Sequence, residues 1–179
     1  SRQAVAELKA LGVATILLSG DNPATAKTIA ALAGINESQG GLLPHDKLAQ
    51  VQALQRRFGA IGMAGDGIND APALAQSDIG FAMGAAGTDT AMEAADVVIM
   101  NDDLRRLPET IRLSRQTRAV LIQNISLALG IKVVFIVLAL LGSATMWMAV
   151  FADVGATLLV IANGLRLLKA RTEGDAVAE

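Results

Sequence analysis

The stretch "MAGDGINDAPAL", residues 63 to 74, places two aspartates, Asp66 and Asp70, four residues apart among small side chains. Asp66 follows the apolar run "AIGMA" after one glycine, and we interpret this run as a buried strand; Asp70 lies where a short helix is expected to begin. Gly65 and Gly67 flank Asp66, where glycine lets the backbone turn tightly and leaves room for a ligand. The pattern therefore predicts two carboxylates at the carboxyl end of a strand.

These carboxylates suit a magnesium site. Mg²⁺ is usually bound by one or two carboxylates, several waters and a phosphate oxygen. Asp66 and Asp70 could supply the carboxylates, and Asn69 could hydrogen-bond a coordinated water. The simpler alternative is that Asp70 only caps the following helix within a polar loop. The spacing alone does not separate these two interpretations.

The residues around this motif alternate between helix and strand, which predicts an α/β domain. Short apolar runs without polar alternation indicate buried strands at "VATILLS", "AIGMA", "IGFAM" and "DVVIM". Helices are expected over residues 2–11, 23–32, 47–57, 71–76 and 88–94. Such alternation is typical of a parallel sheet covered by helices on both faces. Ligands of these sheets bind at the carboxyl ends of the strands.

Two further stretches carry candidate phosphate-binding groups. In "LLSGDNPAT", the Ser19 hydroxyl and the backbone N–H of Gly20 could hold phosphate oxygens after an apolar strand. Asp21 could contribute there, although an aspartate before a helix is often only its N-cap. In "LLPHDKLAQVQ", Lys47 lies near a helix start, where the dipole disfavours a cation, so a nearby anion is expected. A solvated surface lysine is the ordinary alternative.

The second part of the chain has the composition of membrane helices. Residues 119–165 contain only two charged side chains, Lys132 and Asp153. The apolar segment 119–142 would extend roughly 36 Å as a helix and 148–165 roughly 27 Å, against a bilayer core of about 30 Å. A buried helical pair in a soluble core is the alternative. Basic residues lie on both sides of the pair, so both ends are expected to face the cytoplasm.

The two intramembrane charges predict an ion site. Charged groups are costly within hydrocarbon, and those that occur there commonly serve function. Lys132 and Asp153 have opposite signs on adjacent helices, so we expect them to pair; a purely structural ion pair is the alternative. Asp153 offers a hard oxygen ligand, and Lys132 a built-in counter-charge that a dication could displace, whereas soft Cu(I) would prefer sulfur ligands. This chemistry favours a divalent cation.

Composition excludes several other classes of protein and site. The formal net charge of -2 argues against a nucleic-acid partner. The chain has no cysteine, so it forms neither a disulfide nor a cysteine zinc site by itself.

The stretches "SGD", "PHDK" and "GDGINDAPAL", followed by "MGAAGTDTAMEAADVVIM", closely resemble the phosphorylation domain of P-type ATPases, which has the haloacid dehalogenase-like fold. The resemblance covers about residues 1 to 169. It implies that Ser19, Gly20 and Asp21 form the phosphate loop, that Lys47 neutralises the phosphoryl group, and that the cofactors are Mg²⁺ and ATP. Asp66 would bind Mg²⁺, with Asn69 and Asp70 completing the site.

The family's phosphorylated aspartate, in "DKTGT", and its nucleotide-binding domain are not in these 179 residues. The resemblance therefore implies the C-terminal portion of a longer pump, which alone should not hydrolyse ATP. We divide the chain into part of the phosphorylation domain, a basic stalk helix, two transmembrane helices and a cytoplasmic tail, at 1–104, 105–118, 119–142, 148–165 and 166–179.

The apolar segments sharpen the resemblance. "ALGIKVVF" and "MWMAVFADVGATLLVIANGLRLL" are similar to the last two helices of zinc/cadmium/lead-exporting P-type ATPases, in which a Lys and an Asp at these positions belong to the ion pathway. This implies an ATP-driven exporter of Zn²⁺, Cd²⁺ or Pb²⁺ in a bacterial inner membrane. Its partners would be lipid, the rest of the pump and the transported ion. A copper exporter, a soluble phosphatase of the same fold, and a non-catalytic membrane fragment that acts through a partner remain alternatives.

Overall fold

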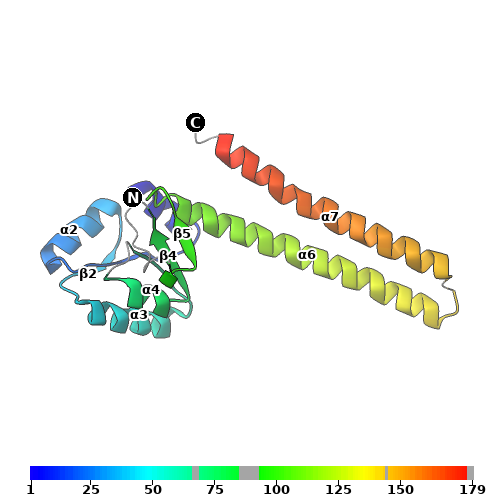
Figure 1. Cartoon of the computed structure of the whole chain (residues 1–179), viewed down its shortest axis with the longest axis horizontal. Helices are drawn as coiled ribbons and strands as arrows, with labels where there is room; N and C mark the ends of the chain where they lie inside the picture. The colour runs from blue at the N-terminus through cyan, green and yellow to red at the C-terminus, as the bar shows by residue number, and fades with distance from the viewer. Residues whose placement is uncertain (66–68, 85–92, 144, 177–179) are drawn as a thin grey trace. The chain divides into compact units, whose positions relative to one another are not determined.

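The computed structural model describes residues 1–65, 69–84, 93–143 and 145–176, with side chains described as far as residue 167. The chain divides into two compact units, Ser1–Glu109 and Thr110–Glu179. The first unit contains every strand of the described residues, and the second consists of two long helices (Figure 1).

The first unit alternates helices and parallel strands, as expected for an α/β domain. Its elements are α1 Arg2–Ala10, β1 Ile16–Leu18, α2 Pro23–Ala33, β2 Glu37–Gln39, α3 Pro44–Phe58, β3 Gly62–Gly65, α4 Ala71–Gln76, β4 Ile79–Met83 and β5 Val97–Ile99. The helix expected over residues 88–94 lies mostly outside the described residues. The α/β fold class is confirmed, and the other predicted elements agree with the structure to within a few residues.

The strands form two parallel sheets among the described residues, whereas the sequence predicted one. β1 pairs with β2, and β3, β4 and β5 form a second sheet in that order. β2 was not predicted, because its residues "ESQ" are all polar and give no apolar signal. Its strand conformation comes from backbone pairing with β1, which a hydropathy pattern does not register.

Helices pack against both sheets and form the core. α2 lies against β1 and β2, and α4 lies against β3 and β4 with α3 beside it. Val51 of α3 and Leu74 of α4 are among the most deeply buried side chains, and Phe81 and Ile99 pack with Leu107 in a second cluster. These contacts hold the carboxyl ends of β1 and β3, where the predicted phosphate-binding residues lie.

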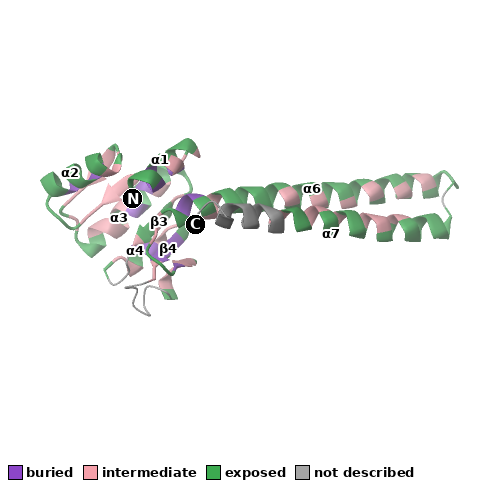
Figure 2. Cartoon of the chain, turned by 90° about the horizontal axis from the view of Figure 1, so that it is seen from above, coloured by how far each residue is buried: buried purple, intermediate pink, exposed green. Residues whose placement is uncertain are grey.

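The second unit is an antiparallel helical hairpin of α6 Arg106–Leu140 and α7 Met146–Ala176 (Figures 1 and 2). Both helices are long and apolar enough to cross a membrane, and only 0% and 6% of their most apolar windows are buried. A buried pair in a soluble core would show the opposite. α6 is continuous through the predicted stalk and membrane segments, and α7 extends into the predicted tail as far as Ala176.

Candidate functional site

The loop after β1 is organised by its own polar side chains. The Ser19 hydroxyl donates to Asp21 Oδ2 at 2.9 Å, and the Asp21 backbone N–H donates to Ser19 Oγ at 3.1 Å. The N-cap of α2 is Asn22, whose Oδ1 accepts from the Thr25 N–H at 2.9 Å. The Asp21 carboxylate is therefore not used for capping; its role is to shape the loop around Ser19.

Residues 39–42 hold this loop from the other side. The Ser19 N–H donates to the Gln39 carbonyl, and the Leu42 N–H donates to the Ser19 carbonyl. A Cβ on Gly40 would lie 2.7 Å from Pro23 Cα and 2.8 Å from the Asp21 carbonyl oxygen, so only glycine fits there. Because α3 begins directly after this segment, the loop and the start of α3 are fixed side by side.

The backbone N–H of Gly20 has no acceptor within the described part of the chain. Gly20 is also exposed, and an added Cβ would meet only the Leu42 carbonyl oxygen at 3.4 Å. An available N–H beside a hydroxyl is suited to bind an anionic oxygen.

The structure joins two of the predicted site residues directly. Lys47, on the first turn of α3, donates from Nζ to Asp70 Oδ1 at 2.6 Å, and each side chain is only 13% exposed. Asp70 precedes α4, but its side chain makes no capping hydrogen bond. The simpler interpretations, a solvated lysine and an aspartate that only caps a helix, are therefore both wrong. The anion expected near Lys47 is the carboxylate of Asp70.

Gly65 makes room for this ion pair. A Cβ at Gly65 would lie 2.9 Å from Asp70 Oδ2 and 3.1 Å from Asp70 Cβ. The space expected to admit a ligand thus holds a carboxylate oxygen that has no protein partner among the described residues. Asn69 is exposed in the turn before α4. The predicted Asp66 and Gly67 lie outside the described residues.

The fit of this site to Mg²⁺ rests on Asp70. No cluster of three or more histidine, cysteine, aspartate or glutamate side chains occurs in the parts of the chain that are described. Mg²⁺ needs only one or two protein carboxylates, because waters and phosphate oxygens complete its octahedron. Asp70 has one oxygen on Lys47 and a second oxygen in the space at Gly65, so its donor set is compatible with Mg²⁺.

A carboxylate outside the site fixes the second sheet. Asp78 Oδ2 accepts from the Ile61 N–H at 2.9 Å and from Gln55 Nε2 at 3.1 Å. These hydrogen bonds, the one from Ile61 first, hold the pKa of Asp78 below its ordinary value. Asp78 thereby ties the residue before β3 to α3 and to the start of β4.

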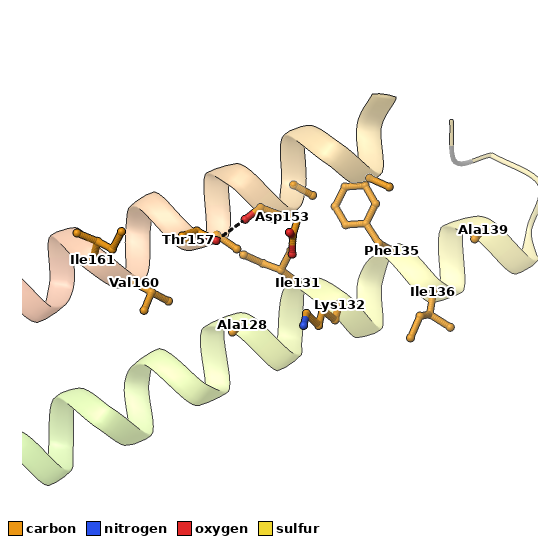
Figure 3. Close-up of a pocket in the computed structure, with 13 residues that line it drawn as sticks. Ala128, Ile131, Lys132, Phe135, Ile136, Ala139, Asp153, Thr157, Val160 and Ile161 are labelled. Carbon is orange, nitrogen blue, oxygen red and sulfur yellow. Dashed lines mark hydrogen bonds between the residues drawn. The ribbon is translucent and has the colours of Figure 1, made fainter. Parts of the chain in front are cut away.

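The hairpin contains a cavity of about 630 Å³ between α6 and α7. Figure 3 shows Lys132 of α6 and Asp153 of α7 among its mostly apolar lining residues. The expected ion pair is not formed, since no ion pair within 4.0 Å joins them in the described chain. The Asp153 carboxylate points toward α6, whereas the Lys132 side chain runs along its own helix. They share a cavity without touching.

Two features of the hairpin were not predicted. The Thr157 hydroxyl, which also lines the cavity, donates to the backbone carbonyl of Asp153 at 2.9 Å. Farther along the helices, the Asn163 amide donates to side chains of Gln123 and Asn124. Amide side chains within apolar segments are the sequence signal for such contacts, but they are neutral and less conspicuous than the charges of Lys132 and Asp153.

Comparison with known proteins finds relatives over most of the chain. Residues 1–78 match the haloacid dehalogenase-like hydrolase family. The chain is 51% identical to a probable cadmium-transporting ATPase of Listeria monocytogenes over 96% of the chain and 24% of that protein. It is 50% identical to the zinc/cadmium/lead-transporting P-type ATPase of Escherichia coli K12, over 94% of the chain and 22% of that protein.

Solved structures give the same result. The crystal structure of a zinc-transporting PIB-type ATPase in the E2.Pi state is similar with a TM-score of 0.87 and 49% identity, over 93% of this chain and 27% of that one. A phosphatase from Moraxella catarrhalis is 21% identical with a TM-score of 0.53 over 62% of this chain and 66% of that one, which indicates a shared fold. The chain thus spans about a quarter of the length of the transporters that it matches.

Proposed function

We infer that this chain is the C-terminal part of an ATP-driven exporter of divalent heavy-metal ions. The reason is that it belongs to the heavy-metal P-type ATPases of the zinc/cadmium/lead-exporting subgroup. The exporter works through an aspartyl-phosphate intermediate, whose aspartate and nucleotide-binding domain are not in these 179 residues. The observation that carries the proposal is the placement of Lys132 and Asp153 on one cavity, because they are the only charged side chains of residues 119–165.

The first unit binds the phosphoryl group in this proposal. The Ser19 hydroxyl and the Gly20 N–H hold phosphoryl oxygens, and Asp21 keeps the Ser19 loop in place. The three donors of the Lys47 ammonium allow it to hold Asp70 and a phosphoryl oxygen together. An anion and a carboxylate can share this site because the lysine neutralises part of their charge.

Mg²⁺ would be held by Asp66 and Asp70, with Asn69 hydrogen-bonded to a coordinated water. When bound, it would neutralise the negative charge of the phosphoryl oxygens. Lys47 orients Asp70, and Gly65 leaves the second oxygen of that carboxylate accessible. ATP reaches the pump through a nucleotide-binding domain outside this sequence.

The hairpin takes up the transported ion. Asp153 contributes an oxygen ligand, and Lys132 compensates its charge when no ion is bound. A divalent cation binds the carboxylate more strongly than a monovalent one, because its attraction to the carboxylate is about twice as large. The remaining ligands come from helices outside this chain, since these residues include no cysteine.

The membrane orientation follows from the basic residues that flank the hairpin. Five arginines from Arg105 to Arg118 precede the apolar segment 119–142, and Arg166, Lys169 and Arg171 follow the apolar segment 148–165. Such residues are retained on the cytoplasmic side, so the first unit and the C-terminus face the cytoplasm. The proposed location is the bacterial inner (plasma) membrane, which is supported by the bacterial origin of the relatives.

A copper exporter fits the cavity less well. Cu(I) prefers thioether and thiolate ligands, and the cavity lining contains no methionine or cysteine. Met146 and Met148 lie at the first turn of α7, by the hairpin tip, beside the interfacial Trp147. A soluble phosphatase, in turn, would not leave two long apolar helices exposed.

The test is metal-stimulated ATPase activity of a full-length pump that carries this chain. Asp153→Ala should reduce zinc stimulation at least tenfold, because a ligand to the ion is lost, while Leu158→Ala, an exposed position on the same helix, should not. A panel of Zn²⁺, Cd²⁺, Pb²⁺ and Cu(I) separates the two exporter classes. Unchanged zinc stimulation in Asp153→Ala would remove Asp153 as a ligand, and preferential stimulation by Cu(I) would favour the copper alternative.

A further inference from the structure

Three amide side chains connect the two membrane helices on the side of the cavity toward the C-terminus of α7. Asn163 Nδ2 of α7 donates to Asn124 Oδ1 of α6 at 2.9 Å and to Gln123 Oε1 at 3.3 Å. Asn163 Oδ1 accepts from Arg166 Nη1 at 3.3 Å. We refer to Gln123, Asn124 and Asn163 as the amide clamp. It uses three of the four hydrogen-bonding positions of the Asn163 amide.

Arg166 determines the direction of these hydrogen bonds. A guanidinium group can only donate, so the Asn163 oxygen must face Arg166. The NH₂ group of Asn163 then faces α6, and Asn124 and Gln123 must present their oxygens to it. One residue with a fixed charge therefore orders three amides that would otherwise be free to rotate.

The amide clamp lies within the apolar segments of the two helices, where a lost hydrogen bond is costly. Gln123 and Asn124 lie in the apolar segment 119–142, and Asn163 lies in 148–165. An amide without a partner is costly in hydrocarbon, where no water replaces the lost hydrogen bond. Apolar contacts between two lipid-facing helices tolerate sliding, because lipid tails are as apolar as the side chains. The clamp is directional and favours one register.

The clamp and the cavity lie at matching distances along the two helices. Ile131 of α6 and Ala156 of α7, which both line the cavity, are each seven residues from the Asn124–Asn163 contact. Seven residues are about two helical turns, so both positions return to the face that carries the clamp, roughly 10 Å away. The amide contact therefore fixes which residues of α7 stand opposite which residues of α6 along the cavity.

We propose that Asn163 is a positioning residue that sets the register of α7 on α6 and thereby keeps Asp153 opposite Lys132 across the cavity. Asp153 is ten residues, roughly 15 Å, from Asn163, and Lys132 is eight residues, roughly 12 Å, from Asn124. A slip by one turn would displace Asp153 by about 5.4 Å and remove it from this arrangement. The proposal concerns the hairpin itself and holds whichever ion the cavity accepts.

Cysteine cross-linking of the full chain in lipid nanodiscs tests the register. The chain has no native cysteine, so introduced pairs react without background. Ile131→Cys is combined either with Ala156→Cys, which lies at the same level of the hairpin and forms the level pair, or with Val160→Cys, which lies one helical turn farther along α7. The measured quantity is the cross-linking yield of the level pair divided by that of the other pair. All three positions line the cavity. Asn163→Ala is compared with Ser126→Ala, because the Ser126 side chain of α6 makes no hydrogen bond in the described chain.

We expect the ratio to favour the level pair in the unsubstituted background and with Ser126→Ala. It should fall roughly threefold to twentyfold with Asn163→Ala, the range that interhelical hydrogen bonds in membranes support. Asn124→Ala should have the same effect from the other helix, and the double variant should add little. An unchanged ratio in Asn163→Ala and in Asn124→Ala would overturn the proposal.

A second measurement distinguishes positioning from general support. In a full-length pump that carries this chain, Asn163→Ala should raise the zinc concentration for half-maximal ATPase stimulation threefold or more, with the maximal rate little changed. A lower maximal rate at unchanged half-saturation would contradict a positioning role. If zinc stimulates no variant, including the unsubstituted pump, the proposed transport function fails, while cross-linking still decides the register.

Discussion

Replacing Lys47 with methionine should destabilise the first unit through the charge that it leaves behind. Lys47 Nζ and Asp70 Oδ1 are 2.6 Å apart, and both side chains are 13% exposed. Methionine preserves much of the aliphatic length of lysine but removes the ammonium group. The Asp70 carboxylate then remains in a confined space beside Gly65 with no cation to compensate it.

The expected cost is about 3 kcal/mol. Removal of one partner of a buried ion pair typically costs about 3–5 kcal/mol, most of it from the uncompensated charge. The lower end applies here because the remaining exposure of Asp70 gives water some access. Asp70→Asn should cost about 1.5 kcal/mol, since the asparagine oxygen still accepts a hydrogen bond from Lys47. The double variant should cost about 2 kcal/mol, well below the sum, because no lone charge remains.

Native-state hydrogen exchange of the full chain in detergent micelles measures these free energies locally. Peptides from β3 and α4 should exchange about 100-fold faster in Lys47→Met, which corresponds to about 3 kcal/mol, while peptides from α7 serve as an internal control. Lys27→Met makes the same change at an exposed lysine of α2 that has no ion pair among the described residues. It should cost less than about 0.5 kcal/mol. Equal effects of the two substitutions would refute the reasoning.

Two other residues of the first unit give independent predictions. Gly40→Ala should cost about 3 kcal/mol in urea unfolding, because its Cβ would lie 2.7 Å from Pro23 Cα; Gly20→Ala, whose Cβ would meet only the Leu42 carbonyl oxygen at 3.4 Å, should cost less than about 0.5 kcal/mol. Asp103 is hydrogen-bonded to Arg105, which lowers the pKa of its carboxyl to about 2. A lowered folded-state pKa stabilises above the ordinary value of 3.8 and loses this effect as the pH falls toward 2. Asp103→Asn should therefore lower the urea midpoint at pH 5 and converge with the unsubstituted protein near pH 2; parallel midpoints from pH 5 to 2 would contradict this.

The predictable part of the fold is the part that depends on hydropathy. β4 and β5 are apolar runs, and the amphipathic α3 and the helix α2 with its proline start follow from side-chain pattern. β2 is not recognisable in this way, because "ESQ" becomes a strand only by pairing with β1. The division into two sheets likewise depends on which backbones pair, and backbone pairing leaves no mark on composition.

For the candidate site, the residue types were predictable from the sequence, whereas the contacts between distant residues were not. Residue type and local spacing identified Ser19, Asp21, Lys47 and Asp70 as polar groups after strands or near helix starts. Spacing could not reveal that Lys47 and Asp70 touch, since 23 residues separate them and the contact depends on how α3 packs beside α4. In the hairpin, opposite charge suggested a contact between Lys132 and Asp153 that the structure does not contain.

In the hairpin, the neutral side chains of the amide clamp position Lys132 and Asp153 without themselves lining the cavity. A salt bridge between Lys132 and Asp153 would hold the helices together but would also compete with any cation for the carboxylate. With register set by amides some two turns or more away, Asp153 can stand opposite Lys132 and still be available to a ligand. Hydrogen bonds between amides suit this task because they are directional and add no net charge within the membrane. Because register is set apart from the ion site, an ion could bind to the cavity and leave it while the two helices keep their alignment.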